Sequence, residues 1–199
     1  MASRRLIVGI TGASGVIYGV RFLERLRQRG DTEIHLVMTD AAKVTLAHEV
    51  GATPQSLAGA ATVLHSVENM AASIASGSFR TAGMVVIPCS MKTLSAVAHC
   101  QGDNLLVRAA DVCLKERRPL VLVPRETPLH LGHLRAMAAA AEIGALIVPP
   151  MPGFYFRPKT IDDLIDHTIG KIFDLLGFDH QLFERWGEGR AARRPQGGD

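Results

Sequence analysis

The chain has 199 residues and is 47% hydrophobic, and its 22 Lys and Arg residues against 19 Asp and Glu residues give a formal net charge of +3. This length and apolar content predict one domain with a sizeable core, which we place at 1–188, and a disordered basic tail at 189–199. The small charge excess and the 5% aromatic content disfavour nucleic acid as a partner, because that partner needs a basic face with stacking aromatic side chains. A small anionic ligand suits the composition better.

The sequence also indicates the cellular compartment to expect. No apolar run approaches the roughly 18 residues of a membrane span, and the first residues lack the pattern of a secretion signal. The three cysteines, Cys89, Cys100 and Cys113, have no paired spacing, which favours a reducing compartment. We therefore expect a cytoplasmic protein with no membrane partner, whose cysteines are small buried apolar residues.

Five short apolar runs predict buried strands, and the segments between them have helical periodicity. The runs are 6–10, 34–38, 84–87, 120–123 and 145–148. After the first run, one helical face carries Val16, Val20, Leu23 and Leu26. Strands that alternate with helices predict a doubly wound α/β fold, in which a parallel sheet lies between two helical layers.

Sheets of this kind bind ligands beyond the carboxyl ends of their strands. The chain has polar or glycine-rich sequence at all five such places, 11–15, 39–40, 88–93, 124–126 and 149–155. The first lies in GITGASGVIYG (9–19), a glycine-rich turn that opens a helix. Because such a turn offers free backbone N–H groups and the positive end of a helix dipole, its natural ligand is a phosphate.

Two other nucleotides compete for this turn. ATP is disfavoured because a P-loop ends in Gly-Lys-Ser/Thr and this turn has no lysine. A nicotinamide dinucleotide would use Asp40 as its ribose-binding acid, and Tyr155 and Lys159 have the spacing of a short-chain dehydrogenase pair. The glycine spacing differs from G-x-G-x-x-G, however, and Pro158 makes the segment a poor helix, so a dehydrogenase is the less favoured alternative.

A D-D-x-x-D pattern at Asp162, Asp163 and Asp166 matches the magnesium-diphosphate motif of prenyl synthases. Thr160 offers a simpler explanation, because it can cap a helix in which Asp163 completes a capping box. We interpret the pattern as a helix start.

Two further patterns could carry chemistry. His130 and His133 could form half of a zinc site, but no matching cysteine or carboxylate pair is evident, and they are expected to begin a helix. Cys89 could be a nucleophile, although a lone cysteine at a strand end is more often packing.

Taken in order, the strand-end segments resemble the UbiX-type flavin prenyltransferases over roughly residues 5–188. They read GITGASGVIYG, MTDAAKVTLAHE, IPCSMKTLSAVAH, AADVCLKERRPLVLVPRETPLHLGHL and PPMPGFYFRP. The resemblance implies a flavodoxin-like (Rossmann-like) fold related to the flavin-dependent cysteine decarboxylases. The Pro-x-Met-Asn motif of those decarboxylases is absent, and the chain has Pro-Cys-Ser-Met-Lys at 88–92.

The resemblance implies an activity and partners. Dimethylallyl monophosphate alkylates reduced FMN at N5 and then at C6, without a metal, to give prenylated FMN for a UbiD-type decarboxylase. It also implies a homo-oligomer, a dodecamer with sites at subunit contacts. Two alternatives remain: an FMN-binding decarboxylase that turns over a carboxylic acid without a partner, and a flavin carrier that needs no second phosphate site.

Matching positions assign the site residues. The FMN positions are Gly12, Ala13, Ser14, Thr39, Ser90, Met91, Lys92, Thr93 and Arg125. The dimethylallyl phosphate positions are Arg108, Lys115, Arg125, Tyr155 and Lys171. Four of these side chains are cations and one is a hydroxyl donor, which suits a departing phosphate because its developing charge must be neutralised. Lys171 stands where some members have arginine and lacks the bidentate fork.

The resemblance gives catalytic roles to three residues. Glu49 matches a glutamate beside the reacting flavin and is the candidate base for the C6 proton. Glu126 matches a glutamate near the leaving phosphate, and Ser14 belongs to the loop that meets FMN.

Overall fold

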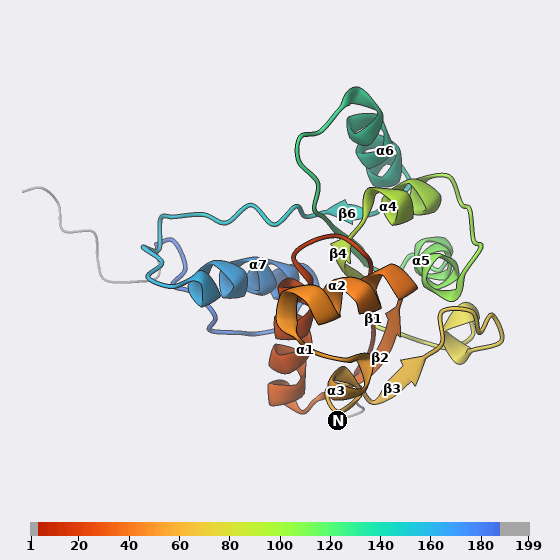
Figure 1. The fold of residues 1–199 in the computed structure, drawn as a ribbon, viewed down its shortest axis with the longest axis horizontal. Coiled ribbons are helices and arrows are strands. Elements are labelled where there is room, and N and C mark those ends of the chain that lie inside the picture. The colour runs from red at the N-terminus through yellow and green to blue at the C-terminus, as the bar shows by residue number, and fades with distance from the viewer. Residues whose placement is uncertain (1–3, 188–199) are drawn as a thin grey trace, which may run out of the picture. The chain divides into compact units, whose positions relative to one another are not determined.

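The computed structural model describes residues 4–187, so the tail expected at 189–199 lies outside the described residues. The chain divides into two compact units, Met1–Pro150 and Met151–Asp199. The first unit contains the sheet, and the second contains one long helix (Figure 1).

The first unit alternates strands and helices. Its strands are β1 (Arg4–Ile10), β2 (Thr32–Met38), β3 (Val63–His65), β4 (Met84–Cys89), β5 (Leu120–Pro124) and β6 (Leu146–Ile147). Its helices are α1 (Val16–Arg29), α2 (Asp40–Val50), α3 (Pro54–Ala58), α4 (Met91–Ala98), α5 (Leu105–Lys115) and α6 (Leu131–Glu142), with a 3₁₀ turn η1 (Ser73–Ala75).

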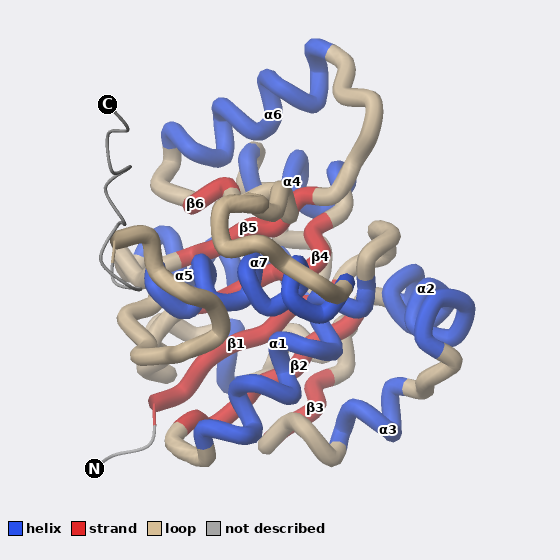
Figure 2. The backbone as a smooth tube through the Cα atoms, turned by 90° about the vertical axis from the view of Figure 1, so that its left-hand side faces the viewer, coloured by secondary structure: helices blue, strands red, loops and turns tan. Residues whose placement is uncertain are grey.

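All six strands are parallel, in the order β3-β2-β1-β4-β5-β6. The chain builds outward from β1 to β3 and then restarts on the other side of β1 with β4 (Figure 2). Right-handed crossovers therefore place α1 on one face of the sheet and α4 and α5 on the other. This confirms the doubly wound α/β fold, and its strand order reverses between β1 and β4.

The core confirms the predicted helical face of α1. Val16, Leu23 and Leu26 are fully buried, and Val20 is 8% exposed. Burial of such a side chain contributes about 1.5–3 kcal/mol, so this face holds α1 on the sheet.

Two expectations were incomplete. The sequence pattern did not predict β3, because Val63 and Leu64 are exposed in this short edge strand and form no buried run. The expectation that all three cysteines are buried is wrong for Cys100, which is exposed just after α4.

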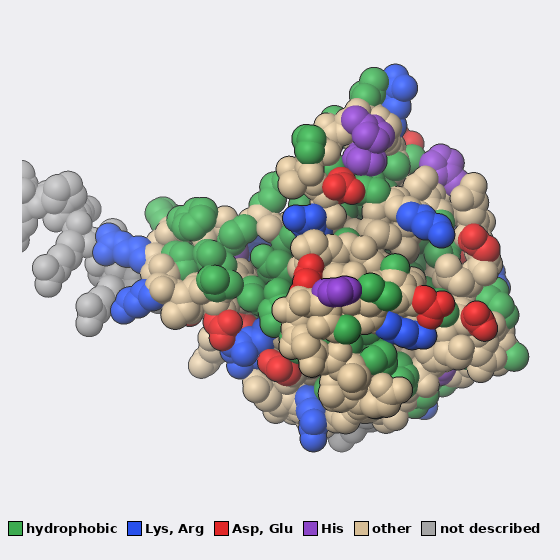
Figure 3. Space-filling model, viewed as in Figure 1, with side chains coloured by type: hydrophobic (Ala, Val, Ile, Leu, Met, Phe, Trp, Pro, Cys, Tyr) green, Lys and Arg blue, Asp and Glu red, His purple; other side chains and the backbone are tan. Residues whose placement is uncertain are grey.

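The second unit is an extended segment followed by α7 (Ile161–Leu175). Thr160 and Asp163 form a reciprocal capping box, which confirms the interpretation of the D-D-x-x-D pattern as a helix start. Several large apolar side chains of this unit are exposed, and apolar side chains gather on its visible surface in Figure 3. They are Met151, Phe154, Tyr155, Ile161 and Trp186.

Across the described residues, no helix has both the length and the apolar character that crossing a membrane requires.

Candidate functional site

One buried threonine ties two strand-end turns together. The Thr11 hydroxyl donates to the Pro88 carbonyl oxygen at 2.9 Å and accepts the Ser90 N–H at 2.7 Å. Thr11 is 0% exposed and follows β1, whereas Pro88 and Ser90 lie at the end of β4. The glycine turn and the Ser90 turn are therefore neighbours at the point where the strand order reverses.

The glycine turn also packs against the start of α2. A Cβ added at Gly12 would collide with the Ala41 side chain, so only glycine allows this approach. Thr39 caps α2, its hydroxyl accepting the Ala42 N–H at 3.2 Å, and its own N–H donates to the Ile10 carbonyl oxygen at 3.1 Å. The structure thus brings Gly12, Thr39 and Ser90 to one edge of the sheet, as the sequence predicts.

The Ser90 turn opens α4. The Ser90 hydroxyl accepts the Thr93 N–H at 3.3 Å and lies 3.1 Å from the Thr93 hydroxyl. Met91 and Lys92 are the first residues of α4, so no carbonyl within the helix accepts their N–H groups. Hydroxyls and helix-start N–H groups at three adjoining turns fit the phosphate and polar ring edge of a flavin mononucleotide.

Glu49 lies against the start of α1. Its carboxylate accepts the Gly15 N–H at 2.9 Å and the Val16 N–H at 3.0 Å. Desolvation raises the pKa of Glu49, but hydrogen bonds from the Ser14 hydroxyl and these two N–H groups, together with the Arg125 cation, hold it below its ordinary value. The carboxylate is therefore ionised at neutral pH.

This contact reduces the number of backbone N–H groups that the glycine turn can donate to a ligand. The N–H groups of Gly15 and Val16, expected to face a phosphate, donate to Glu49 instead. The anion at the N-terminus of α1 is thus the protein's own carboxylate. A phosphate role for the turn stays a prediction for Gly12, Ala13 and Ser14.

Two other assigned residues act on this carboxylate: the Ser14 hydroxyl donates a hydrogen bond to it, and the Arg125 cation lowers its pKa. Arg125 follows β5 and is anchored by its N–H to the Cys89 carbonyl oxygen at 3.3 Å. Glu126 is the next residue and is exposed, with its carboxylate accepting the Thr127 N–H at 3.0 Å.

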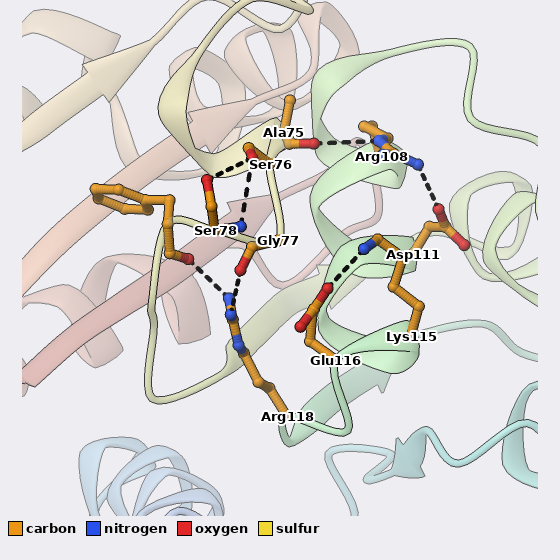
Figure 4. A network of polar contacts seen from close by, with 10 residues as sticks. Ala75, Ser76, Gly77, Ser78, Arg108, Asp111, Lys115, Glu116 and Arg118 are labelled. Atoms are coloured by element: carbon orange, nitrogen blue, oxygen red, sulfur yellow. Dashed lines mark hydrogen bonds and ion pairs between the residues drawn. The ribbon is translucent and has the colours of Figure 1, made fainter.

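Arg108 and Lys115 lie elsewhere, on the flank of α5 that contacts η1 and the loop after it (Figure 4). Arg108 donates to the Ala75 carbonyl oxygen at 3.2 Å and pairs with Asp111 at 2.7 Å. Lys115 pairs with Glu116 at 2.6 Å. Both cations are partly exposed, so an incoming anion can compete for them.

The topology separates Lys115 from the glycine turn. Because the strands are parallel, α5 runs from the carboxyl edge of the sheet back to the amino edge, where β5 begins at Leu120. Lys115 is the last residue of α5 and therefore lies at the amino edge, whereas Gly12, Thr39 and Ser90 lie at the carboxyl edge. One copy of the first unit does not place them in one cleft.

No sequence prediction pointed to the loop opposite α5. Arg118 donates to the carbonyl oxygens of Phe79 at 2.7 Å and Gly77 at 2.6 Å, and the hydroxyls of Ser76 and Ser78 are 2.9 Å apart (Figure 4). The Ser-Gly-Ser sequence is a polar, glycine-containing signal, but it precedes β4 and so escaped a search confined to the carboxyl ends of strands.

The remaining two assigned residues belong to the second unit. The Tyr155 hydroxyl lies 3.2 Å from Nε2 of His167, and Lys171 lies 3.8 Å from Asp174. Both Tyr155 and Lys171 are substantially exposed.

The other candidate groups have structural roles. His130 caps α6, its Nδ1 accepting the Gly132 N–H at 3.0 Å, which confirms that these histidines begin a helix. Cys89 is fully buried and burial raises its pKa far above that of a free thiol, so it packs rather than reacts. Between residues 4 and 187, no cluster of three or more His, Cys, Asp or Glu side chains suits a metal ion.

Comparison with known proteins adds a family. A family model described as Flavoprotein matches residues 1–173. The chain is 57% identical to flavin prenyltransferase UbiX of Thauera aromatica, over 92% of this chain and 93% of the relative. It is 56% identical to flavin prenyltransferase UbiX of Escherichia coli, over 92% of this chain and 98% of that one.

Solved structures agree with this comparison. The crystal structure of AnUbiX in complex with FMN and dimethylallyl pyrophosphate matches with a TM-score of 0.90 and 47% identity, covering 92% of this chain and 97% of that chain. A dodecameric FMN-dependent UbiX-like decarboxylase from Escherichia coli matches with a TM-score of 0.86 and 48% identity, covering 88% and 96%.

Proposed function

We propose that the chain joins the dimethylallyl group of dimethylallyl monophosphate to N5 and C6 of reduced FMN. The chain belongs to the Flavoprotein family, and within it to the UbiX-type flavin prenyltransferases, which supports this proposal. The observation that carries this proposal is the cluster of Ser14, Glu49 and Arg125 beside the turns at Thr39 and Ser90. It combines a flavin cradle, an ionised carboxylate and a cation.

The cradle is formed by the three carboxyl-edge turns. The hydroxyls of Thr39 and Ser90 and the first N–H groups of α4 are proposed to hold the FMN phosphate, with Gly12, Ala13 and Ser14 against the flavin. The start of α1 is excluded from phosphate binding, since Glu49 takes its N–H groups. When bound, reduced FMN supplies the nucleophilic N5 and C6 atoms.

Glu49 is the proposed base. Its carboxylate is fixed by two backbone N–H groups and the Ser14 hydroxyl, and its lowered pKa keeps it ionised. In this state it can accept the proton that leaves C6 as the fourth ring closes. Arg125 and Glu126, adjacent in the chain, are proposed to meet the leaving phosphate, Arg125 by neutralising its charge.

Arg108 and Lys115 are proposed to act in the site of a second copy of the chain. Lys115 lies at the amino edge, away from the cradle of its own unit, and a relative of 48% identity is described as dodecameric. In such an assembly Lys115, at the amino edge of one copy, can face the carboxyl edge of another. The family resemblance assigns Arg108, Tyr155 and Lys171 to the same phosphate. This assembly would place several donors around one departing phosphate.

The deciding experiment is anaerobic incubation with reduced FMN and dimethylallyl monophosphate, followed by mass spectrometry of the flavin. We expect a flavin heavier by one C5H8 unit. A parallel reaction with dimethylallyl pyrophosphate is included, because a related structure is described with that compound. Unchanged flavin in both reactions would favour the carrier alternative, and carbon dioxide release from a carboxylic acid would favour the decarboxylase.

A second experiment tests the shared site by complementation. Glu49→Gln and Lys115→Ala oligomers are each measured alone and then after dissociation and joint reassembly. Activity recovered only after mixing supports donation of Lys115 to another copy. If mixed oligomers form and remain inactive, Lys115 does not complete the site of a neighbour.

The proposed recipient of the product is a UbiD-type decarboxylase in the cytoplasm. An inactive apo-decarboxylase of this type should gain activity when incubated with the reaction mixture. Its failure to do so, with prenylated flavin present, would reject the recipient but leave the transferase activity intact.

A further inference from the structure

A histidine of α7 sits in an aromatic cluster of the second unit. His167 is 7% exposed, and its ring stacks on Phe156 at 4.8 Å with an interplanar angle of 6°. Phe183 lies 4.8 Å from it on a tilted plane. Its Nε2 is 3.2 Å from the Tyr155 hydroxyl. The cluster thus holds the imidazole in one orientation, with one nitrogen aimed at Tyr155.

The other ring nitrogen of His167 has no hydrogen-bond partner. Within residues 4–187, Nδ1 is buried and unpaired. A proton on Nδ1 would be a buried donor without an acceptor, and orphaned N–H groups are rarer in proteins than under-used acceptors. The favoured neutral tautomer therefore carries its proton on Nε2.

This tautomer fixes the direction of the phenolic proton. If Nε2–H donates to the Tyr155 oxygen, the hydroxyl proton of Tyr155 cannot point at His167 and is available to another acceptor. In the opposite tautomer, the Tyr155 hydroxyl would donate its only proton in a hydrogen bond to Nε2 and could not donate to another acceptor. A tyrosine that holds a phosphate must keep that proton.

We propose that His167 is a positioning residue for prenyl transfer, whose Nε2–H turns the Tyr155 hydroxyl proton toward the substrate phosphate. The inference rests on the proposed function, since it assigns Tyr155 to that phosphate. Accepting one hydrogen bond also makes the phenol a stronger donor of its own.

The charge state of His167 agrees with this role. Burial, and secondly the Lys171 cation one turn further along α7, lower the pKa of His167, so the ring is neutral at pH 7. Neutrality matters because a doubly protonated ring would carry an unpaired buried N–H at Nδ1.

The tautomer can be measured without any substrate. Magic-angle-spinning NMR of the full-length protein labelled with ¹⁵N-histidine distinguishes protonated from bare ring nitrogens, and His167→Gln identifies the signal. We expect a protonated Nε2 and a bare Nδ1. A protonated Nδ1 with a bare Nε2 overturns the inference, whatever the protein's activity.

A double-mutant cycle tests the consequence. His167→Phe keeps a stacking ring and removes both nitrogens, of which only Nε2 has a partner among the described residues, and should raise KM for the prenyl phosphate by about 10-fold with little change in FMN affinity. His167→Gln, which can place an amide N–H near the same point, should restore most of this loss. In a Tyr155→Phe background, His167→Phe should cost nothing further.

His180 supplies the matched control. It lies in the same unit and its two ring nitrogens are both paired, with Asp174 at 3.0 Å and the Leu182 N–H at 3.2 Å. His180→Phe should lower thermal stability and cost the same with or without the Tyr155 hydroxyl. If His167→Phe raises KM by the same factor with and without the Tyr155 hydroxyl, the role of His167 is structural and the inference is overturned. Absence of prenyl transfer by the wild type would reject the proposed function and leave the tautomer result standing.

Discussion

Glu49→Gln is the sharpest perturbation of the site, because it removes a charge and preserves shape. The Glu49 carboxylate is the acceptor for the Gly15 and Val16 N–H groups and lies at the positive end of α1. A glutamine oxygen can still accept one of these hydrogen bonds but carries no charge. The substitution therefore isolates the interaction of the carboxylate charge with the helix start.

The size of the effect follows from this geometry. A charge at a helix N-terminus contributes roughly 0.3–1 kcal/mol at an exposed site, and Glu49 is exposed. With the weakened charge-assisted hydrogen bonds included, we expect a loss of about 1 kcal/mol. For a chain of this size such a loss lowers Tm by about 2–4 °C.

The pH dependence has a definite sign. The folded-state pKa of Glu49 lies below its unfolded value of about 4.3, so its stabilisation is complete above that pH and is lost as pH falls through the folded-state pKa. Differential scanning fluorimetry of wild type and Glu49→Gln should show a constant Tm gap at pH 6–8 that closes on acidification below about pH 4. Glu126→Gln, whose carboxylate contacts one N–H outside any helix, should show almost no gap. Equal Tm values at pH 7, or a gap that persists in acid, would refute the reasoning.

Four further outcomes are expected. Equilibrium titration should show tighter binding of FMN than of FAD, NAD or NADP, because the three turns suit one phosphate and one isoalloxazine ring; preference for NAD would restore the dehydrogenase alternative. Treatment with EDTA should leave the transfer rate unchanged, since Asp163 is engaged in a capping box; a loss reversed by magnesium would revive the D-D-x-x-D site. Lys115→Ala and Arg125→Ala should each slow transfer by about two to three orders of magnitude. Lys115→Ala should affect FMN binding less, whereas Arg125→Ala should also weaken it, because Arg125 is assigned to FMN as well; full activity of Lys115→Ala would remove it from the site. Gly12→Ala should weaken FMN binding through its collision with Ala41, and Ala41→Gly should restore it; unaltered binding by Gly12→Ala would show that the turn does not contribute.

The sequence predicted the strands that are buried on both faces of the sheet. β1, β2, β4 and β5 are buried over most of their length, so each appears in the sequence as a continuous apolar run. The edge strand β3 is half solvated, and nothing in its composition distinguishes Val63–His65 from a loop. The other edge strand, β6, was predicted by the apolar run at 145–148, so β3 escaped prediction because its exposed apolar residues form no such run.

The candidate site was predictable only in part, for a related reason. Turns that follow apolar runs can be placed at one edge of the sheet, which correctly grouped Gly12, Thr39 and Ser90. The contact of Glu49 with the start of α1 joins residues 34 positions apart and depends on the packing of α2, which no local pattern encodes. The same holds for Arg118 and the Phe79 carbonyl, 39 positions apart.

The positions of the assigned cations and hydroxyls bear on how the chain would bind the two phosphates of the proposed reaction, that of FMN and that of the prenyl donor. The carboxyl edge gathers backbone N–H groups, the hydroxyls of Thr39 and Ser90 and the cations of Lys92 and Arg125, a donor set that we propose to hold FMN. Arg108 and Lys115 lie on α5, where Arg108 pairs with Asp111 within the helix and Lys115 pairs with Glu116 at its end. Because those pairs are exposed, each is worth no more than about 1 kcal/mol and can be exchanged for a substrate phosphate. We therefore expect a single chain to bind flavin, and full neutralisation of a departing phosphate to need cations of a second copy. Flavin binding and prenyl transfer should thus separate on dilution, with transfer lost when the assembly dissociates and FMN binding retained.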